Sequence, residues 1–144
     1  MGDPIFILLV EDNPADIKLT RLAFEKLKIQ NEIFAVQDGV EAIKYLRKQG
    51  EYGNAARPDL ILLDLNLPKK NGREVLKEIK EDPELRTIPV LILTSSSEER
   101  DIHETYHNHA NSFITKPVDL GSFNSVVNSI ETFWFTIVKL PKVN

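Results

Sequence analysis

The sequence predicts an α/β fold, a doubly wound five-stranded parallel sheet with helices on both faces. Short apolar runs alternate along the chain with segments whose apolar residues recur at helical spacing, which is typical of β-α units. The apolar runs are nearly continuous, as expected for strands that are buried on both faces. A chain of 144 residues with 42% hydrophobic residues is long enough for one such domain with a normal core.

The first two β-α units occupy the N-terminal third of the chain. Residues 5–10 (IFILLV) predict a strand, and Asn13 and Pro14 suit the start of the helix that follows. Residues 32–36 (EIFAV) predict the second strand, and Asp38 with the glycine after it predicts a turn. The residues expected on the buried faces of the two helices are Ala15, Leu19, Leu22, Ala23 and Leu27, then Val40, Ile43 and Leu46.

The third and fourth units follow a segment of loop-like composition. Residues 49–57 (QGEYGNAAR) contain two glycines and small polar residues, which predict a loop. Residues 60–63 (LILL) predict the third strand, and residues 72–81 predict its helix. Residues 89–93 (PVLIL) predict the fourth strand, and residues 97–109 have a helical pattern with a sparse apolar face.

The last unit ends in an aromatic tail. Residues 112–115 (SFIT) predict a short fifth strand, and the final helix is expected to begin near Asp119. Residues 131–144 (ETFWFTIVKLPKVN) carry more apolar side chains than one helix face can bury, so we expect an interface there. We therefore expect a single domain over residues 1–144 with an extended C-terminal helix and tail. The side chains expected in the interface are Phe133, Trp134 and Phe135.

Five β-α units with right-handed crossovers favour the strand order 2-1-3-4-5, in which ligands bind outside the carboxyl ends of the strands. Polar residues stand at four of these ends, and we expect the second strand to contribute none. They are Glu11 and Asp12 after the first strand, Asp64 after the third, Thr94 after the fourth and Lys116 after the fifth.

The chemistry of this group predicts phosphoryl transfer. Three carboxylates in one small space are stable only with a cation or with raised pKa values. Hard oxygen ligands with few protein contacts suit Mg²⁺ or Mn²⁺. A cation, a lysine and a hydroxyl around one carboxylate make a phosphoryl-transfer site, in which Asp64 is the candidate nucleophile and forms an aspartyl phosphate.

These motifs together resemble the receiver domain of two-component response regulators, which has a flavodoxin-like strand order. The resemblance covers about residues 5–130 and depends on the order and spacing of several motifs. The matching segments are LLVEDN (8–13), LLDLNLP (62–68), Gly72, LTSS (93–96) and FITKP (113–117).

The resemblance implies a role for each matching residue. Asp64 is the phosphoacceptor, Asp12 is a direct Mg²⁺ ligand, and Glu11 acts mostly through water. The backbone carbonyl of Asn66 is the third protein ligand, and Ser95 offers a backbone N–H to the phosphate.

Four further roles concern the phosphate and the switch. Lys116 contacts the phosphate, and the Lys116–Pro117 peptide bond is cis, which only a following proline makes plausible. Thr94 is the switch hydroxyl, and Phe113 stands where the family often has a tyrosine. Because Phe cannot hydrogen-bond through its ring, its inward movement would depend on packing alone.

The implied function is that of a stand-alone response regulator. It accepts a phosphoryl group from a sensor histidine kinase and changes the surface of helix 4, strand 5 and helix 5 to bind partners or to dimerise. It is not a turnover enzyme, because it catalyses only its own Mg²⁺-dependent phosphorylation and dephosphorylation. The tail and residues 57–76 resemble regulators paired with cyanobacterial phytochromes, which implies a phytochrome-like kinase and a homodimer.

Composition excludes several other classes. The chain has no cysteine, which excludes disulfides and thiolate metal sites. Its net charge of −4 and the lack of a basic stripe argue against direct nucleic-acid binding, and we expect the Lys69-Lys70 pair to lie in a solvated loop. No apolar run approaches the roughly 20 residues that span a bilayer, so we expect a cytoplasmic protein without membrane contact.

Three rival functions remain open at this point. A pseudo-receiver would bind partners without taking phosphate. An aspartate-nucleophile phosphohydrolase requires a second Asp two residues after the first, where this chain has Asn66. A flavodoxin-like flavin carrier requires a hydroxyl- and glycine-rich loop where this chain has the acidic residues 11–16 (EDNPAD). His103 and His107 are spaced for zinc on one helix face, but the sequence offers no third ligand.

Overall fold

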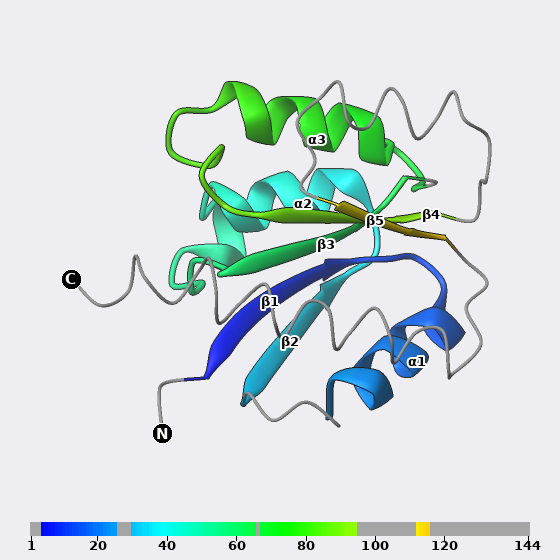
Figure 1. Cartoon of the computed structure of the whole chain (residues 1–144). Helices are drawn as coiled ribbons and strands as arrows, with labels where there is room; N and C mark the ends of the chain where they lie inside the picture. Colours follow the sequence, from blue (N-terminus) through cyan, green and yellow to red (C-terminus); the bar gives the residue numbers. More distant parts are fainter. Residues whose placement is uncertain (1–3, 26–29, 66, 95–111, 116–144) are drawn as a thin grey trace.

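The computed structural model confirms the predicted fold, with one five-stranded sheet between two layers of helix (Figure 1). The structure describes residues 4–25, 30–65, 67–94 and 112–115. The strands are parallel in the predicted order β2-β1-β3-β4-β5. The elements are β1 (Ile5–Val10), α1 (Pro14–Glu25), β2 (Asn31–Val36), α2 (Gly39–Leu46), the short 3₁₀ helix η1 (Gly50–Tyr52), β3 (Leu60–Asp64), α3 (Gly72–Glu81), β4 (Val90–Thr94) and β5 (Ser112–Thr115).

The core is divided between the two faces of the sheet because successive strand residues point to opposite sides. Leu8 and Val10 of β1 pack with α2 and α3 on one face. Ile7 and Leu9 pack with α1 on the other. All five residues of β3 are buried, as predicted for a central strand. Figure 1 shows the same layering, with α1 on one side of the sheet and α2 and α3 on the other.

Two aromatic side chains depart from the expectation of strands buried on both faces. In β1, Phe6 is 37% exposed, and in the edge strand β2, Phe34 is 47% exposed. Phe34 stacks on Tyr45 of α2, with 5.1 Å between ring centroids, and meets the edge of Tyr52 in η1. The rings of Tyr45 and Tyr52 therefore cover part of the Phe34 ring.

The predicted buried face of α1 is partly wrong. The helix buries Ala23 as expected, but its other buried residues are Thr20 and Phe24, whereas Ala15 and Leu22 are exposed. Burying the larger ring of Phe24 removes more apolar area from water than burying Leu22. Thr20 can be buried because its hydroxyl donates to the carbonyl of Asp16 at 2.8 Å.

The starts of α2 and α3 follow from their capping residues. Asp38 caps α2, since its side chain accepts from the backbone N–H of Glu41. Asn71 and Glu74 form a reciprocal capping box at the start of α3, the bounds of which match the prediction. The segment expected to be a loop, residues 49–57, contains η1.

Several predictions lie outside the described residues. They are the helices expected over residues 97–109 and from Asp119 onward, and the tail at residues 131–144 with its proposed interface. Among the helices that the structure describes, none is long and apolar enough to cross a membrane.

Candidate functional site

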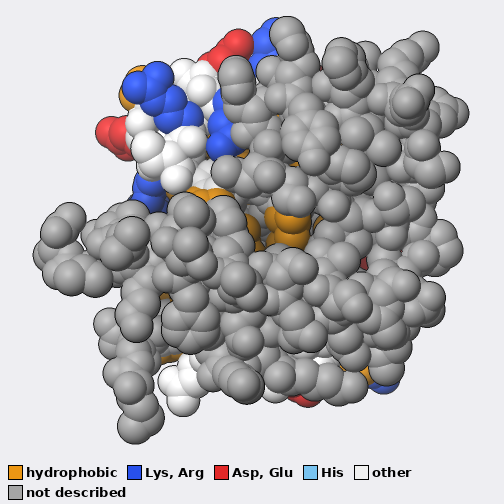
Figure 2. Space-filling model, viewed as in Figure 1, with side chains coloured by type: hydrophobic (Ala, Val, Ile, Leu, Met, Phe, Trp, Pro, Cys, Tyr) orange, Lys and Arg blue, Asp and Glu red, His pale blue; other side chains and the backbone are white. Residues whose placement is uncertain are grey.

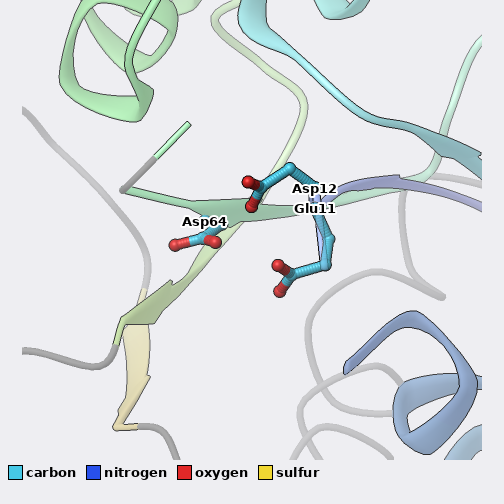
Figure 3. A group of neighbouring side chains, drawn as sticks. All are labelled: Glu11, Asp12 and Asp64. Carbon is cyan, nitrogen blue, oxygen red and sulfur yellow. The ribbon is translucent and has the colours of Figure 1, made fainter. Parts of the chain in front are cut away.

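Three acidic side chains meet at the carboxyl ends of β1 and β3 (Figure 3). Glu11 and Asp12 directly follow β1, and Asp64 is the last residue of β3. One carboxylate oxygen from each residue lies within 4.8 Å of the others. The parallel register of β1 and β3, with Val10 opposite Leu63, explains why residues far apart in sequence arrive together. The structure thus brings together the three acids as the sequence predicts.

The burial of these acids makes their proximity electrostatically unfavourable unless a cation is present. Glu11 and Asp64 are buried, at 0% and 3% exposure, whereas Asp12 is exposed. The backbone N–H of Asn13 donates to Glu11 Oε2 at 3.2 Å. Carboxylate oxygens are the ligands that Mg²⁺ and Mn²⁺ prefer, and the exposed Asp12 keeps the group open to solvent. The donor set therefore fits a hydrated divalent cation.

Backbone hydrogen bonds just beyond the strands hold the acids in place. The N–H of Glu11 donates to the Val36 carbonyl at 3.0 Å, which extends the pairing of β1 with β2. The N–H of Leu65 donates to the Leu93 carbonyl at 3.2 Å, which extends the pairing of β3 with β4. Asn13 then caps α1 by accepting from the N–H groups of Ala15 and Asp16. Hydrogen bonds of the backbone therefore fix the chain at Glu11 and directly after Asp64.

Gly72 brings α3 against the end of β3. Its N–H donates to the Leu65 carbonyl at 3.0 Å. A Cβ at this position would lie 2.2 Å from the Asp64 carbonyl oxygen and 2.5 Å from Leu65 Cα. Only glycine permits this close contact, which explains the glycine at position 72, shortly after the LLDLNLP motif.

The remaining predicted site residues are described only in part. Thr94 ends β4 opposite Thr115 of β5, and Phe113 of β5 lies opposite Ile92, so the backbones of Thr94 and Phe113 occupy neighbouring strands. Their side chains fall outside the description. Asn66, Ser95, Lys116, Pro117, His103 and His107 lie outside the described residues, so their roles stay predictions.

Asp38 and the Lys69-Lys70 pair make contacts that the sequence analysis did not predict. Asp38 follows β2 and is only 9% exposed, so the second strand does supply a polar group to this edge. Its Oδ2 lies 3.5 Å from Lys69 Nζ, and the Lys69 side chain is exposed as expected, whereas Lys70 is half-buried and forms an ion pair with Glu78. The signal for Asp38 was its position three residues before Glu41, which is typical of an N-cap. The lysine contacts had no local signal, because their partners are distant in sequence.

Comparisons with known proteins agree with the motif resemblance. Residues 7–128 match the family described as response regulator receiver domain. Response regulator Rcp1 of Synechocystis sp. is 48% identical over 138 residues, which cover 96% of this chain and 94% of Rcp1. The probable methanogenesis regulatory protein FilR2 of Methanothrix harundinacea is 43% identical over 132 residues, which cover 92% of this chain and 84% of FilR2.

Solved structures with the same fold include two response regulators that are about half identical to this chain. The phosphorylated cyanobacterial phytochrome response regulator RcpA matches with a TM-score of 0.85 and 53% identity, covering 92% of this chain and 95% of RcpA. The Mn²⁺-bound form of Rcp1 matches with a TM-score of 0.83 and 48% identity, covering 91% of this chain and 94% of Rcp1.

Proposed function

Because the chain belongs to the family of response regulator receiver domains, we propose that its Asp64 accepts a phosphoryl group from a phosphorylated histidine of a sensor kinase. The observation that carries the proposal is the position of Asp64, which is buried at the end of the central strand β3 and faces Glu11 and Asp12. A carboxylate in that position can react with a small group that enters from the carboxyl edge of the sheet.

The reaction is a displacement at phosphorus. A carboxylate oxygen of Asp64 forms the new bond, the P–N bond of phosphohistidine breaks, and the imidazole nitrogen keeps the bonding electron pair. Oxygens of Asp12 and Asp64 and the backbone carbonyl of Asn66 would hold Mg²⁺ or Mn²⁺ directly, and Glu11 would act mostly through water. When bound, the cation neutralises charge on the transferring group. The Mn²⁺-bound form of the relative Rcp1 supports this assignment.

The signal then passes to the side of the sheet formed by β4 and β5. Lys116 and the backbone N–H of Ser95 bind the phosphate, Thr94 moves toward it, and Phe113 moves into the space that Thr94 leaves. The pairing of Asp64 with Leu93, the residue before Thr94, supports this route because it places the end of β4 beside the phosphoacceptor.

The partner in this proposal is a phytochrome-like histidine kinase in the cytoplasm, where the ATP that such kinases use is available. RcpA, at 53% identity, is a cyanobacterial phytochrome response regulator that has been solved in its phosphorylated form. The chain acts as a single receiver domain over residues 1–144. Its output is protein binding, including a homodimer through Phe133, Trp134 and Phe135, rather than nucleic-acid binding or turnover of a substrate.

Incubation with acetyl phosphate and Mg²⁺, followed by intact mass spectrometry, tests the phosphoacceptor. We expect the wild type to gain the mass of one phosphoryl group and Asp64→Asn to gain none. Asp59→Asn, in the residue directly before β3, is the matched control, because the Asn oxygen can still accept from the N–H of Phe6. An unmodified wild type would favour the phosphate-independent pseudo-receiver, and a modified Asp64→Asn would move the acceptor elsewhere.

Sedimentation of the phosphorylated and unphosphorylated protein, with and without residues 131–144, tests the dimer. We expect the full chain to form a dimer and the shortened chain to be a monomer. A dimer that survives removal of these residues would place the interface elsewhere.

A further inference from the structure

We propose that Lys69 is a positioning residue for binding of the divalent cation that phosphoryl transfer requires, because its pairing with Asp38 fixes the loop that begins directly after Asp64. This inference rests on the proposed function. The loop, residues 65–71, joins β3 to α3 and is called here the β3–α3 loop. Lys69 is not one of the residues to which the family resemblance assigns a role.

The first half of the β3–α3 loop is held by the core. Leu65 and Leu67 are 2% and 8% exposed and belong to the apolar cluster beneath α2 and α3. The carbonyl of Leu65 accepts from Gly72, which closes the loop at its base. The loop therefore has anchors at both ends, and Lys69 lies between them.

Between these anchors, Lys69 has a backbone conformation that side chains rarely adopt. Its φ is 63°, in the left-handed region that favours glycine. A non-glycine residue keeps such a conformation only when its surroundings compensate the strain. The side chain of Lys69 supplies a contact that a glycine could not.

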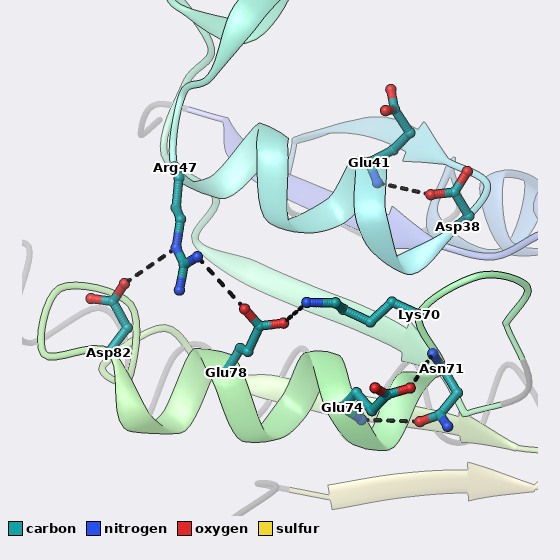
Figure 4. Close-up of polar contacts among 8 residues, drawn as sticks. All are labelled: Asp38, Glu41, Arg47, Lys70, Asn71, Glu74, Glu78 and Asp82. Carbon is teal, nitrogen blue, oxygen red and sulfur yellow. Dashed lines mark hydrogen bonds and ion pairs between the residues drawn. The ribbon is translucent and has the colours of Figure 1, made fainter.

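That contact is an ion pair with a well-fixed carboxylate. Lys69 Nζ lies 3.5 Å from Asp38 Oδ2, and the Asp38 side chain is only 13% exposed. The other oxygen, Oδ1, accepts from the N–H of Glu41 at 2.8 Å, so Asp38 cannot swing toward solvent without uncapping α2 (Figure 4). Because one partner is fixed and mostly buried, the pair is less screened by water than an ordinary surface ion pair.

The ion pair forms where two loops are in direct contact. A Cβ on Gly39, next to Asp38, would lie 1.9 Å from the carbonyl oxygen of Lys70. Lys70 in turn pairs with Glu78 of α3, as Figure 4 shows. Consecutive lysines thus attach the β3–α3 loop to α2 on one side and to α3 on the other.

Two physical effects of Lys69 on the site have opposite signatures. If Lys69 fixes the loop, loss of either partner loosens the backbone after Asp64 and weakens cation binding. If Lys69 acts only through its charge, Lys69→Met makes the edge more negative and strengthens cation binding, whereas Asp38→Asn weakens it. The geometry favours the first effect, because the Lys69 side chain is 69% exposed and directed at Asp38.

Calorimetric titration with Mg²⁺ on the full chain separates these effects. We expect Lys69→Met and Asp38→Asn each to raise the Mg²⁺ Kd by about threefold to fivefold, and the double variant to raise it no further. Asn retains the capping oxygen of Asp38. Lys69→Arg should restore binding, and Lys44→Met is the matched control, since Lys44 forms a surface ion pair with Glu41 within α2.

Two further measurements distinguish a positioning role of Lys69 from a general effect on stability. The maximal rate of acetyl phosphate transfer at saturating Mg²⁺ should change less than twofold, and amide exchange at Leu67 and Lys70 should be faster in Lys69→Met without metal. Opposite shifts in the two single variants, additive effects in the double variant, or an unchanged Kd would overturn this inference alone. A wild type that binds Mg²⁺ but takes no phosphoryl group, or that binds no Mg²⁺, would overturn the proposed function and this inference with it.

Discussion

Two groups of acidic side chains in the described part of the chain differ in their neighbours. At the carboxyl ends of β1 and β3, the carboxylates of Glu11, Asp12 and Asp64 lie within 4.8 Å of one another. Between α2 and α3, each acid meets a cation. There Glu78 lies 3.6 Å from Arg47 and pairs with Lys70, and Asp82 lies 3.7 Å from Arg47.

Neighbouring opposite charges are also visible at the surface of the molecule. In Figure 2, described Lys and Arg side chains lie next to Asp and Glu side chains over the C-terminal end of α3. Opposite charges in contact contribute modestly to stability, whereas like charges in contact reduce it. The comparison teaches that opposite charges in contact suit a structural role, whereas three like charges within 4.8 Å of one another are typical of a functional site. Four substitutions test this difference, from the largest expected effect to the smallest.

The largest effect is expected where the two regions join, at Gly72. In Gly72→Ala, the new Cβ would lie 2.2 Å from the Asp64 carbonyl, so either β3 or α3 must move. We expect the free energy of unfolding to fall by about 3 kcal/mol in urea titrations, although Ala favours the helix. Gly53→Ala is the control, because the nearest atom to its new Cβ lies at 3.7 Å. Equal stability of the two variants would contradict the close contact between α3 and β3.

The fold and the acid group could be predicted because both depend on local pattern. The apolar run at residues 60–63 indicated a central strand, and the position of Asp64 directly after that run placed it at the carboxyl edge. Parallel strand ends share one edge of a sheet, so Glu11 and Asp12 had to arrive nearby. Because β1 and β3 are neighbours in the predicted strand order, no tertiary information was needed to predict that the three acids meet.

The errors arose where tertiary contacts decide between equivalent local patterns. In α1, both Leu22 and Phe24 suit an apolar face, and only packing on the sheet selects Phe24. The contact of Lys69 with Asp38 joins two loops 31 positions apart, and no periodic pattern of residues in the sequence predicts it. The two loops come together because Gly39 has no Cβ that would clash with the carbonyl oxygen of Lys70. The sequence alone does not show that these two segments meet.

The second prediction concerns repulsion within the acid group. In metal-free buffer, Asp12→Asn should raise the free energy of unfolding by about 1–2 kcal/mol, because it removes one of three neighbouring negative charges. Mg²⁺ should raise the Tm of the wild type and have a much smaller effect on Asp12→Asn. Thermal unfolding with and without Mg²⁺ measures both. A variant less stable than the wild type without metal would show that the acids do not repel one another.

The third prediction has the opposite sign. Glu78→Gln weakens the contacts with Arg47 and Lys70, so the free energy of unfolding should fall by about 1 kcal/mol at low salt. The side chain of Glu78 is 28% exposed, so added salt should reduce the loss. Glu84→Gln, at an exposed position in the turn after α3, is the control. Stabilisation by Glu78→Gln would remove the contrast between the two acid groups.

The smallest effect concerns an acid that meets a hydroxyl instead of another charge. The Tyr52 hydroxyl donates to Glu41 Oε1 at 2.8 Å. Burial, this hydrogen bond and the negative charges of Glu41, Glu51 and Asp38 raise the pKa of Tyr52 to about 12. The unfolded phenol loses its proton near pH 10, so the folded state binds more protons between pH 10 and 12. Its contribution to stability is therefore complete below pH 10 and is lost as the pH rises through that window.

Subtracting the phenolate absorbance titration of Tyr52→Phe from that of the wild type isolates this group from Tyr45, the pKa of which burial also raises. Glu41→Gln should lower the pKa of Tyr52 toward its ordinary value, because the nearest negative charge is removed while a hydrogen-bond acceptor remains. The contribution of the raised Tyr52 pKa to the free energy of unfolding should stay below about 1 kcal/mol, because solvent screens a partly exposed group. If Glu41→Gln leaves the pKa of Tyr52 unchanged, Glu41 does not perturb it, and burial with the charges of Glu51 and Asp38 accounts for the raised pKa.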